Sequence, residues 1–198
     1  MFIVILSYVS LFVSTVFHAE SGKPSDLTHQ TKIVVAALAK DVVTALKEKD
    51  MHALAALTHP ENGIRFSPYG FIGEADRVIK ADELEKMWNS KTKVFWGLMD
   101  ATGRPIRRTF KEYYKRFIYD RDFASTKRIT VNDIQRTNKY INVFEKYPKG
   151  VVVEYYFSGD LDFEELDWRS LRLVFEEVED VWYLCGIIHD EWTQSSTD

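Results

Sequence analysis

Ser170-Leu-Arg-Leu-Val-Phe-Glu-Glu-Val-Glu-Asp-Val-Trp-Tyr-Leu-Cys-Gly-Ile-Ile-His189 is the stretch that decides the fold. Its first half places Leu171, Leu173 and Phe175 on one face and Arg172 on the other, the period of two expected for a half-buried strand. Its second half, after an acidic turn, is apolar at successive positions, so both of its faces must be covered. The stretch therefore predicts a hairpin whose second strand lies inside a sheet.

Working outward from this hairpin, apolar residues at helical spacing and a capping box predict four helices upstream. They are expected over Leu27–Lys49, Met51–Leu57, Lys80–Trp88 and from Thr109 onward. Strand patterns then follow at Ile64–Ser67, Val94–Trp96, Ile129–Ile134, Tyr140–Phe144 and Val151–Phe157. Helices followed by a run of strands predict an α+β fold, with N-terminal helices packed on a curved antiparallel sheet that forms a cone with a pocket.

The chain opens with an uncharged apolar run, Met1–Phe17, followed by small residues at Ala19 and Ser21. This pattern is typical of a signal peptide and its cleavage site, although no Lys or Arg precedes the run. We therefore expect a signal peptide over residues 1–21 and a single domain over residues 22–198. The protein is expected in the periplasm or secreted, without a stable membrane span after cleavage; an uncleaved N-terminal anchor is the alternative.

Composition narrows the classes of partner and chemistry. The formal net charge is −4, which argues against a nucleic-acid partner because phosphates call for a basic face. The single cysteine, Cys185, lies in the apolar strand, so no intramolecular disulfide forms and the thiol is expected to be buried. No complete nucleophile, phosphate-loop or metal motif is present, and we predict no cofactor and no bound metal.

The order of elements resembles the nuclear transport factor 2-like superfamily, the cone-shaped group that includes ketosteroid isomerase and scytalone dehydratase. The resemblance rests on the opening helix pair Val34–Leu57 running into Pro60–Phe66, and on the terminal segment Val181–Trp192. It identifies the chain as an exported member and implies a concave pocket. One scaffold of this kind hosts enzymes, ligand carriers and interaction modules, so the resemblance implies a fold rather than an activity.

If the resemblance holds, a set of polar and aromatic residues borders the mouth of the cone. The candidate ligand-binding residues are Arg65, Tyr69, Trp96, Asp100 and Trp192. His59 and His189 are candidate general bases, because an imidazole titrates near neutral pH. The alternative for His59 is a helix-stop residue bonded to the backbone, and for His189 an ordinary polar residue at a strand end.

Three acidic residues in the middle of the chain allow two interpretations. Asp120 and Asp122, with Asp100, offer oxygen ligands for a hard cation. Because the twelve-residue calcium-loop pattern is absent, the spacing favours a charge cluster paired with Arg121 or Arg128.

Two further charged groups lie close to the hairpin. Arg169 or Arg172 is expected to pair across the sheet with Asp or Glu. The acidic run Asp160–Asp167 predicts a solvated loop whose apolar residues dock onto the domain.

From these observations we expect a non-enzymatic domain that binds a small apolar or amphipathic molecule, or a peptide, in a concave pocket. An enzyme using histidine-based acid–base chemistry on a small molecule is one alternative. A protein–protein interaction module of the cell envelope, including a homodimer, is the other.

Overall fold

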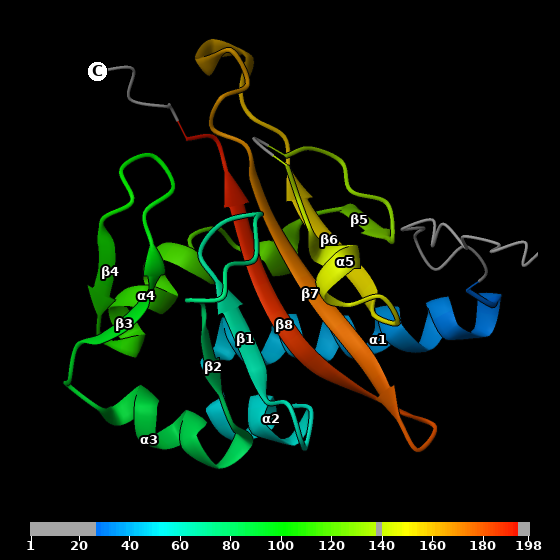
Figure 1. Ribbon diagram of the computed structural model, residues 1–198. Coiled ribbons are helices and arrows are strands. Elements are labelled where there is room, and N and C mark those ends of the chain that lie inside the picture. The colour runs from blue at the N-terminus through cyan, green and yellow to red at the C-terminus, as the bar shows by residue number, and fades with distance from the viewer. Residues whose placement is uncertain (1–26, 138–139, 194–198) are drawn as a thin grey trace, which may run out of the picture.

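The computed structural model describes residues 27–137 and 140–193 (Figure 1). The signal peptide predicted over residues 1–21 lies outside these ranges. Within them, no helix combines the length and the apolar character needed to cross a membrane.

The described residues form an α+β fold, as predicted. The helices are α1 (His29–Glu48), α2 (Met51–Ala56), α3 (Leu84–Asn89), α4 (Phe110–Phe117) and α5 (Val143–Lys146). The strands are β1 (Ile64–Ser67), β2 (Arg77–Ile79), β3 (Val94–Leu98), β4 (Pro105–Arg108), β5 (Arg128–Val131), β6 (Val151–Phe157), β7 (Arg169–Val178) and β8 (Val181–Glu191). Thr109 caps α4 and exchanges hydrogen bonds with Glu112, the capping box expected from the sequence.

The main sheet has the strand order β2-β1-β8-β7-β6-β5, and β3 pairs with β4 in a separate hairpin. Every pair in the main sheet is antiparallel except β1 with β8, which run parallel. A parallel pair needs a long connection, and the whole of the chain between Ser67 and Val181 supplies it. The predicted inner strand, β8, therefore lies between β1 and β7.

Both faces of the sheet are covered, which explains the apolar run of β8. Helix α1 packs behind the sheet and α5 lies in front of it (Figure 1). On the back face, Leu184 and Ile187 of β8 join the large aromatic core of α1 and α4. On the front face, Cys185 and Ile188 pack beneath Val143 of α5. Cys185 is a buried free thiol, as predicted.

Two local predictions are wrong. Tyr140–Phe144 is not a strand but the entry to α5, because β5 and β7 already occupy both edges of β6 and leave no edge for another strand. In the Asp160–Asp167 loop, Leu161 and Phe163 do not dock onto the domain, since they are 82% and 63% exposed, whereas Leu166 is half-buried. That loop projects beyond the ends of β6 and β7 (Figure 1), where ion pairs of Asp167 with Arg121 and of Glu165 with Arg136 hold it.

The chain between β5 and β6, which carries α5, covers the front face of the sheet, and we call it the covering segment. A buried charge network holds this segment in place. Arg172 is 1% exposed, and its Nε donates to Glu154 Oε1 at 2.8 Å while its Nη1 donates to Asp190 Oδ2 at 2.9 Å. The covering segment joins this network through its backbone. Arg172 Nη2 donates to Arg136 O at 2.7 Å, and Gln135 N donates to Glu154 Oε2 at 2.6 Å. The predicted cross-strand pairing of Arg172 is confirmed.

We expect Glu154→Ala to lower the free energy of unfolding by about 3 kcal/mol, because the buried guanidinium of Arg172 would lose a charged partner. Urea unfolding followed by circular dichroism measures the loss. Glu177→Ala is the control at an exposed position of the neighbouring strand β7, with an expected change within about 0.5 kcal/mol. A loss below about 1 kcal/mol for Glu154→Ala would show that this pair does not anchor the fold.

Candidate functional site

An open groove lies between two loops at the C-terminal end of β8. One wall comes from Pro68–Asp76, which joins β1 to β2, and the other from Leu98–Gly103, which joins β3 to β4. We call this the loop groove; its volume is about 460 Å³. Its most exposed apolar side chains are Phe71 and Leu98, at 54% and 49%. Glu74, Asp76 and Asp100 add carboxyl groups, and neither lysine nor arginine lines it among residues 27–137 and 140–193.

The Pro68–Asp76 wall is held from both sides of β8. On the back, His189 Nδ1 lies 3.3 Å from the carbonyl oxygen of Pro68. On the front, Gly70 sits against the Arg172–Asp190 pair so closely that a Cβ there would lie 2.5 Å from Asp190 Oδ2. Any residue with a Cβ at position 70 would displace the ion pair, so only glycine fits there. The wall is therefore a fixed part of the fold.

Asp76 is the most perturbed carboxyl group of the groove. It is almost fully buried, and its Oδ2 accepts a 2.9 Å hydrogen bond from Gly73 N. Burial raises its pKa to about 6, although the nearby Ser67 hydroxyl, the hydrogen bond from Gly73 N and the charge of Arg65 oppose the shift. Gly97 of β3, at φ +128, makes room for the carboxyl, since a Cβ there would lie 2.9 Å from Asp76 Oδ1.

Tyr69 and Asp100 lie on opposite walls of the same groove. The Tyr69 hydroxyl lies 3.5 Å from the Met99 sulfur, and burial, followed by the charge of Glu191, raises its pKa. Asp100 Oδ2 accepts a 2.8 Å hydrogen bond from Thr193 Oγ1, which ties the β3–β4 loop to the chain beyond β8. Two of the residues predicted from the sequence thus meet in one groove.

Behind Tyr69 lies a cluster of paired charges on the back face of the sheet. Asp120 Oδ2 is 2.9 Å from Arg169 Nε and 3.3 Å from His189 Nε2, and Glu191 Oε2 is 3.3 Å from the same Arg169 Nε. Arg116 binds Glu191 through both of its terminal nitrogens. Burial alone would raise the pKa of Asp120, but the hydrogen bond and charge of His189, and then Arg169, outweigh it and lower that pKa.

The carboxylates of this cluster are paired with arginine and histidine side chains, so their proximity does not require a metal ion. Asp120, His189 and Glu191 place ligand atoms within 4.8 Å of one another. The Arg169 Nε already stands between the two carboxylates, where a cation would bind. The expected pairing of Asp120 and Asp122 with Arg121 or Arg128 is wrong. Asp120 pairs with Arg169, and Asp122 pairs with Lys47, because α1 and β7 bring those cations closer.

His189 has no ring nitrogen directed at the groove. Its Nδ1 faces the Pro68 carbonyl and its Nε2 faces the Asp120 carboxylate, and both of those groups only accept hydrogen bonds. The ring therefore links the Pro68–Asp76 wall to Asp120.

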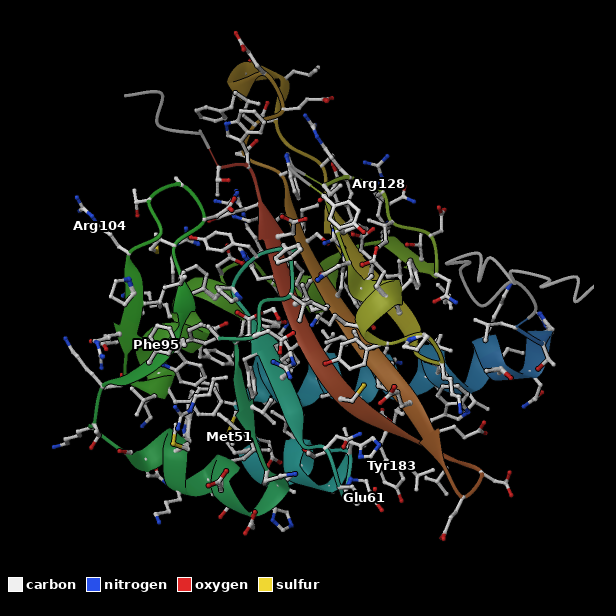
Figure 2. All side chains as sticks on the ribbon, in the orientation of Figure 1. Met51, Glu61, Phe95, Arg104, Arg128 and Tyr183 are labelled. Atoms are coloured by element: carbon white, nitrogen blue, oxygen red, sulfur yellow. The ribbon has the colours of Figure 1, made fainter. Side chains whose placement is uncertain are left out.

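His59 lies at the other end of β8. Its ring Nδ1 accepts from the backbone N–H groups of Glu61 and Asn62, at 3.2 and 3.0 Å. The backbone N–H of His59 donates to Leu184 O. In Figure 2, Glu61 and Tyr183 mark this end of the sheet, far from Arg104 on the β3–β4 loop. The structure therefore does not bring His59 and His189 together.

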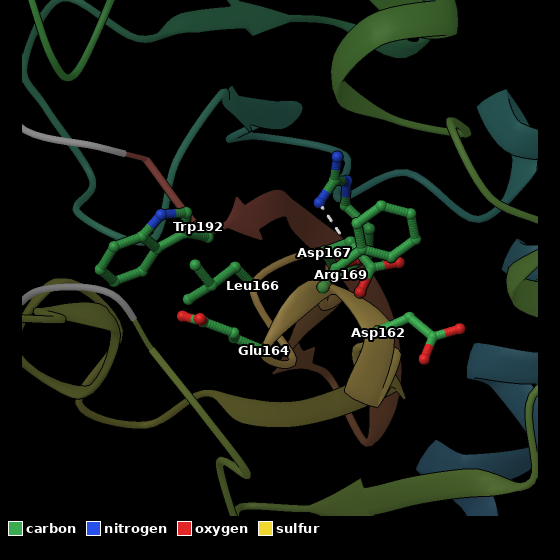
Figure 3. A pocket seen from close by; sticks show the side chains of 7 residues that line it. Asp162, Glu164, Leu166, Asp167, Arg169 and Trp192 are labelled. Carbon is green, nitrogen blue, oxygen red and sulfur yellow. Dashed lines mark hydrogen bonds between the residues drawn. The ribbon is translucent and has the colours of Figure 1, made fainter.

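The remaining candidates are separate from the loop groove. The Arg65 guanidinium donates to Asp76 O at 3.2 Å and thereby supports the wall from outside. Trp96 is fully buried and stacks on Tyr113 at 4.1 Å, so it belongs to the core. Trp192, 41% exposed, lines a second depression of about 500 Å³ beside Arg169 and the acidic loop. Figure 3 shows Trp192, Leu166 and Glu164 along one side of it and Asp162 at the other.

Sequence reasoning missed the groove's central carboxyl and part of the charge cluster. Asp76 stands alone in a Gly-Glu-Ala-Asp turn, and no pattern distinguishes it from a surface residue. Arg169 was expected to pair across the sheet, which is confirmed by Glu191 directly opposite it. The sequence pattern named no partner for Arg169, because that partner depends on the register of the β7–β8 hairpin.

No protein-family model and no curated protein matches this chain. Among solved structures, it is similar to a protein from Xanthomonas campestris described as a calcium/calmodulin dependent protein kinase II association domain. The identity is 15%, over 86% of this chain and 91% of that one, with a TM-score of 0.34. It is also similar to a designed NTF2 protein, at 8% identity over 81% and 98% of the chains, with a TM-score of 0.31. Scores at this level carry no argument about a ligand or an activity.

We expect Asp76 to make the protein less stable as the pH rises from about 4 to about 6. Its folded pKa of about 6 lies above the ordinary value of 3.8, so in this window the folded state holds a proton that the unfolded state has released. The difference between the two pKa values corresponds to about 3 kcal/mol in the free energy of unfolding. This stabilisation is fully present below pH 3.8 and is lost above pH 6.

Asp76→Asn keeps an acceptor for Gly73 N and is expected to remove this pH dependence. Urea unfolding at pH 4 and pH 7 compares the two proteins, with the exposed Asp82→Asn as a control that should follow the wild type. An unchanged pH dependence in Asp76→Asn would contradict the assignment.

Proposed function

We propose that this domain binds, without converting it, a small amphipathic molecule whose polar end donates hydrogen bonds, and that the loop groove is the binding site. The observation that carries the proposal is the pairing of Phe71 and Leu98, both half exposed, across a groove that otherwise presents carboxyl groups. Exposed apolar side chains gathered around a concavity are typical of a binding site.

The polar end of the ligand follows from the charges of the groove. Asp76 and Asp100 present acceptor oxygens, and none of the described residues that line the groove is a lysine or arginine that would attract an anion. A primary amine suits this arrangement, because an ammonium donates three hydrogen bonds and stabilises the ionised form of Asp76. The apolar body of the ligand would lie against Phe71, Leu98 and Met99.

Binding is supported over acid–base chemistry by the histidines. A general base needs a nitrogen within reach of the substrate. The ring nitrogens of His189 face Pro68 O and Asp120, and His59 Nδ1 accepts from its own turn.

Export remains part of the proposal and rests on the apolar run Met1–Phe17. We expect the protein recovered from the exported fraction to have an intact mass that begins near Gly22. A mass that includes residues 1–21 would support the membrane-anchored alternative.

n-Octylamine is the probe for the loop groove, and isothermal titration calorimetry at pH 7 is the measurement. We expect saturable binding that is at least about tenfold tighter than that of n-octanoate, which places a negative charge beside the carboxylates. Affinity should fall as the pH drops below about 6 and Asp76 takes up a proton.

Phe71→Ser is expected to weaken octylamine binding about tenfold, since it removes an aromatic wall from the groove. Val181→Ser is the matched control, because Val181 is as exposed as Leu98 but lies at the tip of the β7–β8 hairpin. Equal affinity for octylamine and octanoate, or an unchanged affinity in Phe71→Ser, would overturn the proposal.

A further inference from the structure

Another cavity, of about 720 Å³, lies where the C-terminal end of α1 meets α3 and α4. It is separate from both the loop groove and the depression beside Trp192. Four lysines line it: Lys47 and Lys49 from the end of α1, and Lys111 and Lys115 from α4. We call it the lysine pocket. It shares no residue with the loop groove.

Three aromatic rings form the wall between these lysines. Trp88 packs edge-on against Tyr114 at 5.2 Å, and Tyr114 stacks nearly parallel to Tyr119 at 6.2 Å. Each ring is fixed by the fold. The Tyr114 hydroxyl donates to Leu46 O, and the Tyr119 hydroxyl donates to Asp122 Oδ1. The wall is therefore a preformed surface for a flat group.

The positive charge of the pocket is only partly neutralised. Lys47 pairs with Asp122 at 2.9 Å. Lys49, Lys111 and Lys115 make no ion pair with any residue in 27–137 or 140–193. The Lys111 ammonium instead lies 5.1 Å from the centre of the Trp88 ring. An anion entering the pocket would thus meet three lysines without displacing a carboxylate.

The helix ends do not account for all of these lysines. Two of the last carbonyl groups of α1, Ala45 O and Leu46 O, already accept from the Lys49 N–H, and Leu46 O also accepts from Tyr114. Lys111 lies in the first turn of α4, where the helix dipole disfavours a cation. The contact of its ammonium with the Trp88 ring holds it there, and an anion in the pocket would offset the repulsion.

We propose that the lysine pocket binds a small anion of about two negative charges attached to a flat ring, such as an aryl phosphate. The phosphate would lie among Lys49, Lys111 and Lys115, and the ring would stack against Trp88 and its neighbours. This site is independent of the loop groove and has the opposite charge preference.

1-Naphthyl phosphate is the probe, titrated into the full-length protein by calorimetry at pH 7.5 and low salt. We expect saturable binding that is at least about tenfold tighter than that of either inorganic phosphate or 1-naphthol. Inorganic phosphate lacks the flat ring, and 1-naphthol lacks the negative charge. Affinity should fall when sodium chloride is raised to about 0.5 M, because salt screens exposed charges.

Reversing two charges, Lys111→Glu with Lys115→Glu, is expected to weaken binding at least about thirtyfold, and the neutral pair Lys111→Gln with Lys115→Gln by an intermediate factor. Lys127→Glu with Lys149→Glu is the matched control, since both are exposed lysines outside the pocket, and should bind within about twofold of the wild type. Circular dichroism confirms that each variant is folded.

Trp88→Leu separates stacking from charge. It should weaken the binding of 1-naphthyl phosphate but leave the affinity for inorganic phosphate unchanged. Phe71→Ser, which tests the loop groove, should leave 1-naphthyl phosphate binding unchanged, so the two proposals fail independently. Absence of saturable binding, or equal affinity in the wild type and the Lys111→Glu, Lys115→Glu variant, would overturn the lysine pocket.

Discussion

The buried guanidinium of Arg172 is the constraint on which the rest of the fold depends. A charge removed from water must have its partners supplied by the protein, and three segments distant in sequence supply them: Glu154 of β6, Asp190 of β8 and the backbone of Arg136. Because the covering segment donates and accepts in this network, the front face of the sheet is sealed, and β8 is free to be apolar on both faces. Arg172 therefore sets the register of three strands as well as the cover above them.

The same network fixes the loop groove. Asp190 and His189 are neighbours on β8 and point to opposite faces of the sheet, as successive strand residues do. One packs against Gly70 and the other contacts Pro68 O, so the wall that carries Tyr69 and Phe71 is held from two directions. A wall held in this way loses little conformational entropy when a ligand binds, which favours affinity at a small site.

The sequence was informative wherever local pattern and tertiary structure agree. The alternation in β7, the capping box at Thr109 and the apolar run of β8 each have a local physical cause, and the α+β order follows from them. The sequence pattern could not supply the features that a long-range event decides, such as the partner of Arg169. An unbulged hairpin that pairs Val178 with Val181 would set Arg169 opposite Asp190. The bulge between Val174 and Phe175 shifts the pairing by one residue. Arg169 therefore lies opposite Glu191, on the face of the sheet that Asp120 contacts. The burial of Asp76 likewise depends on Gly97, which is distant in sequence.

Helix α4 connects the two proposed sites and shows why net charge is a poor guide to ligands in this chain. Its Phe117 packs against Tyr69 at 5.7 Å, behind the acidic loop groove, while Lys111 and Lys115 of the same helix line the lysine pocket. A net charge of −4 averages over these two environments. Exposed charges separated by more than about 10 Å are screened from one another in physiological salt, so each site responds to its own side chains. The charge of the whole chain argues against an extended polyanion such as nucleic acid, but it does not argue against a small anion bound by three lysines and an aromatic wall.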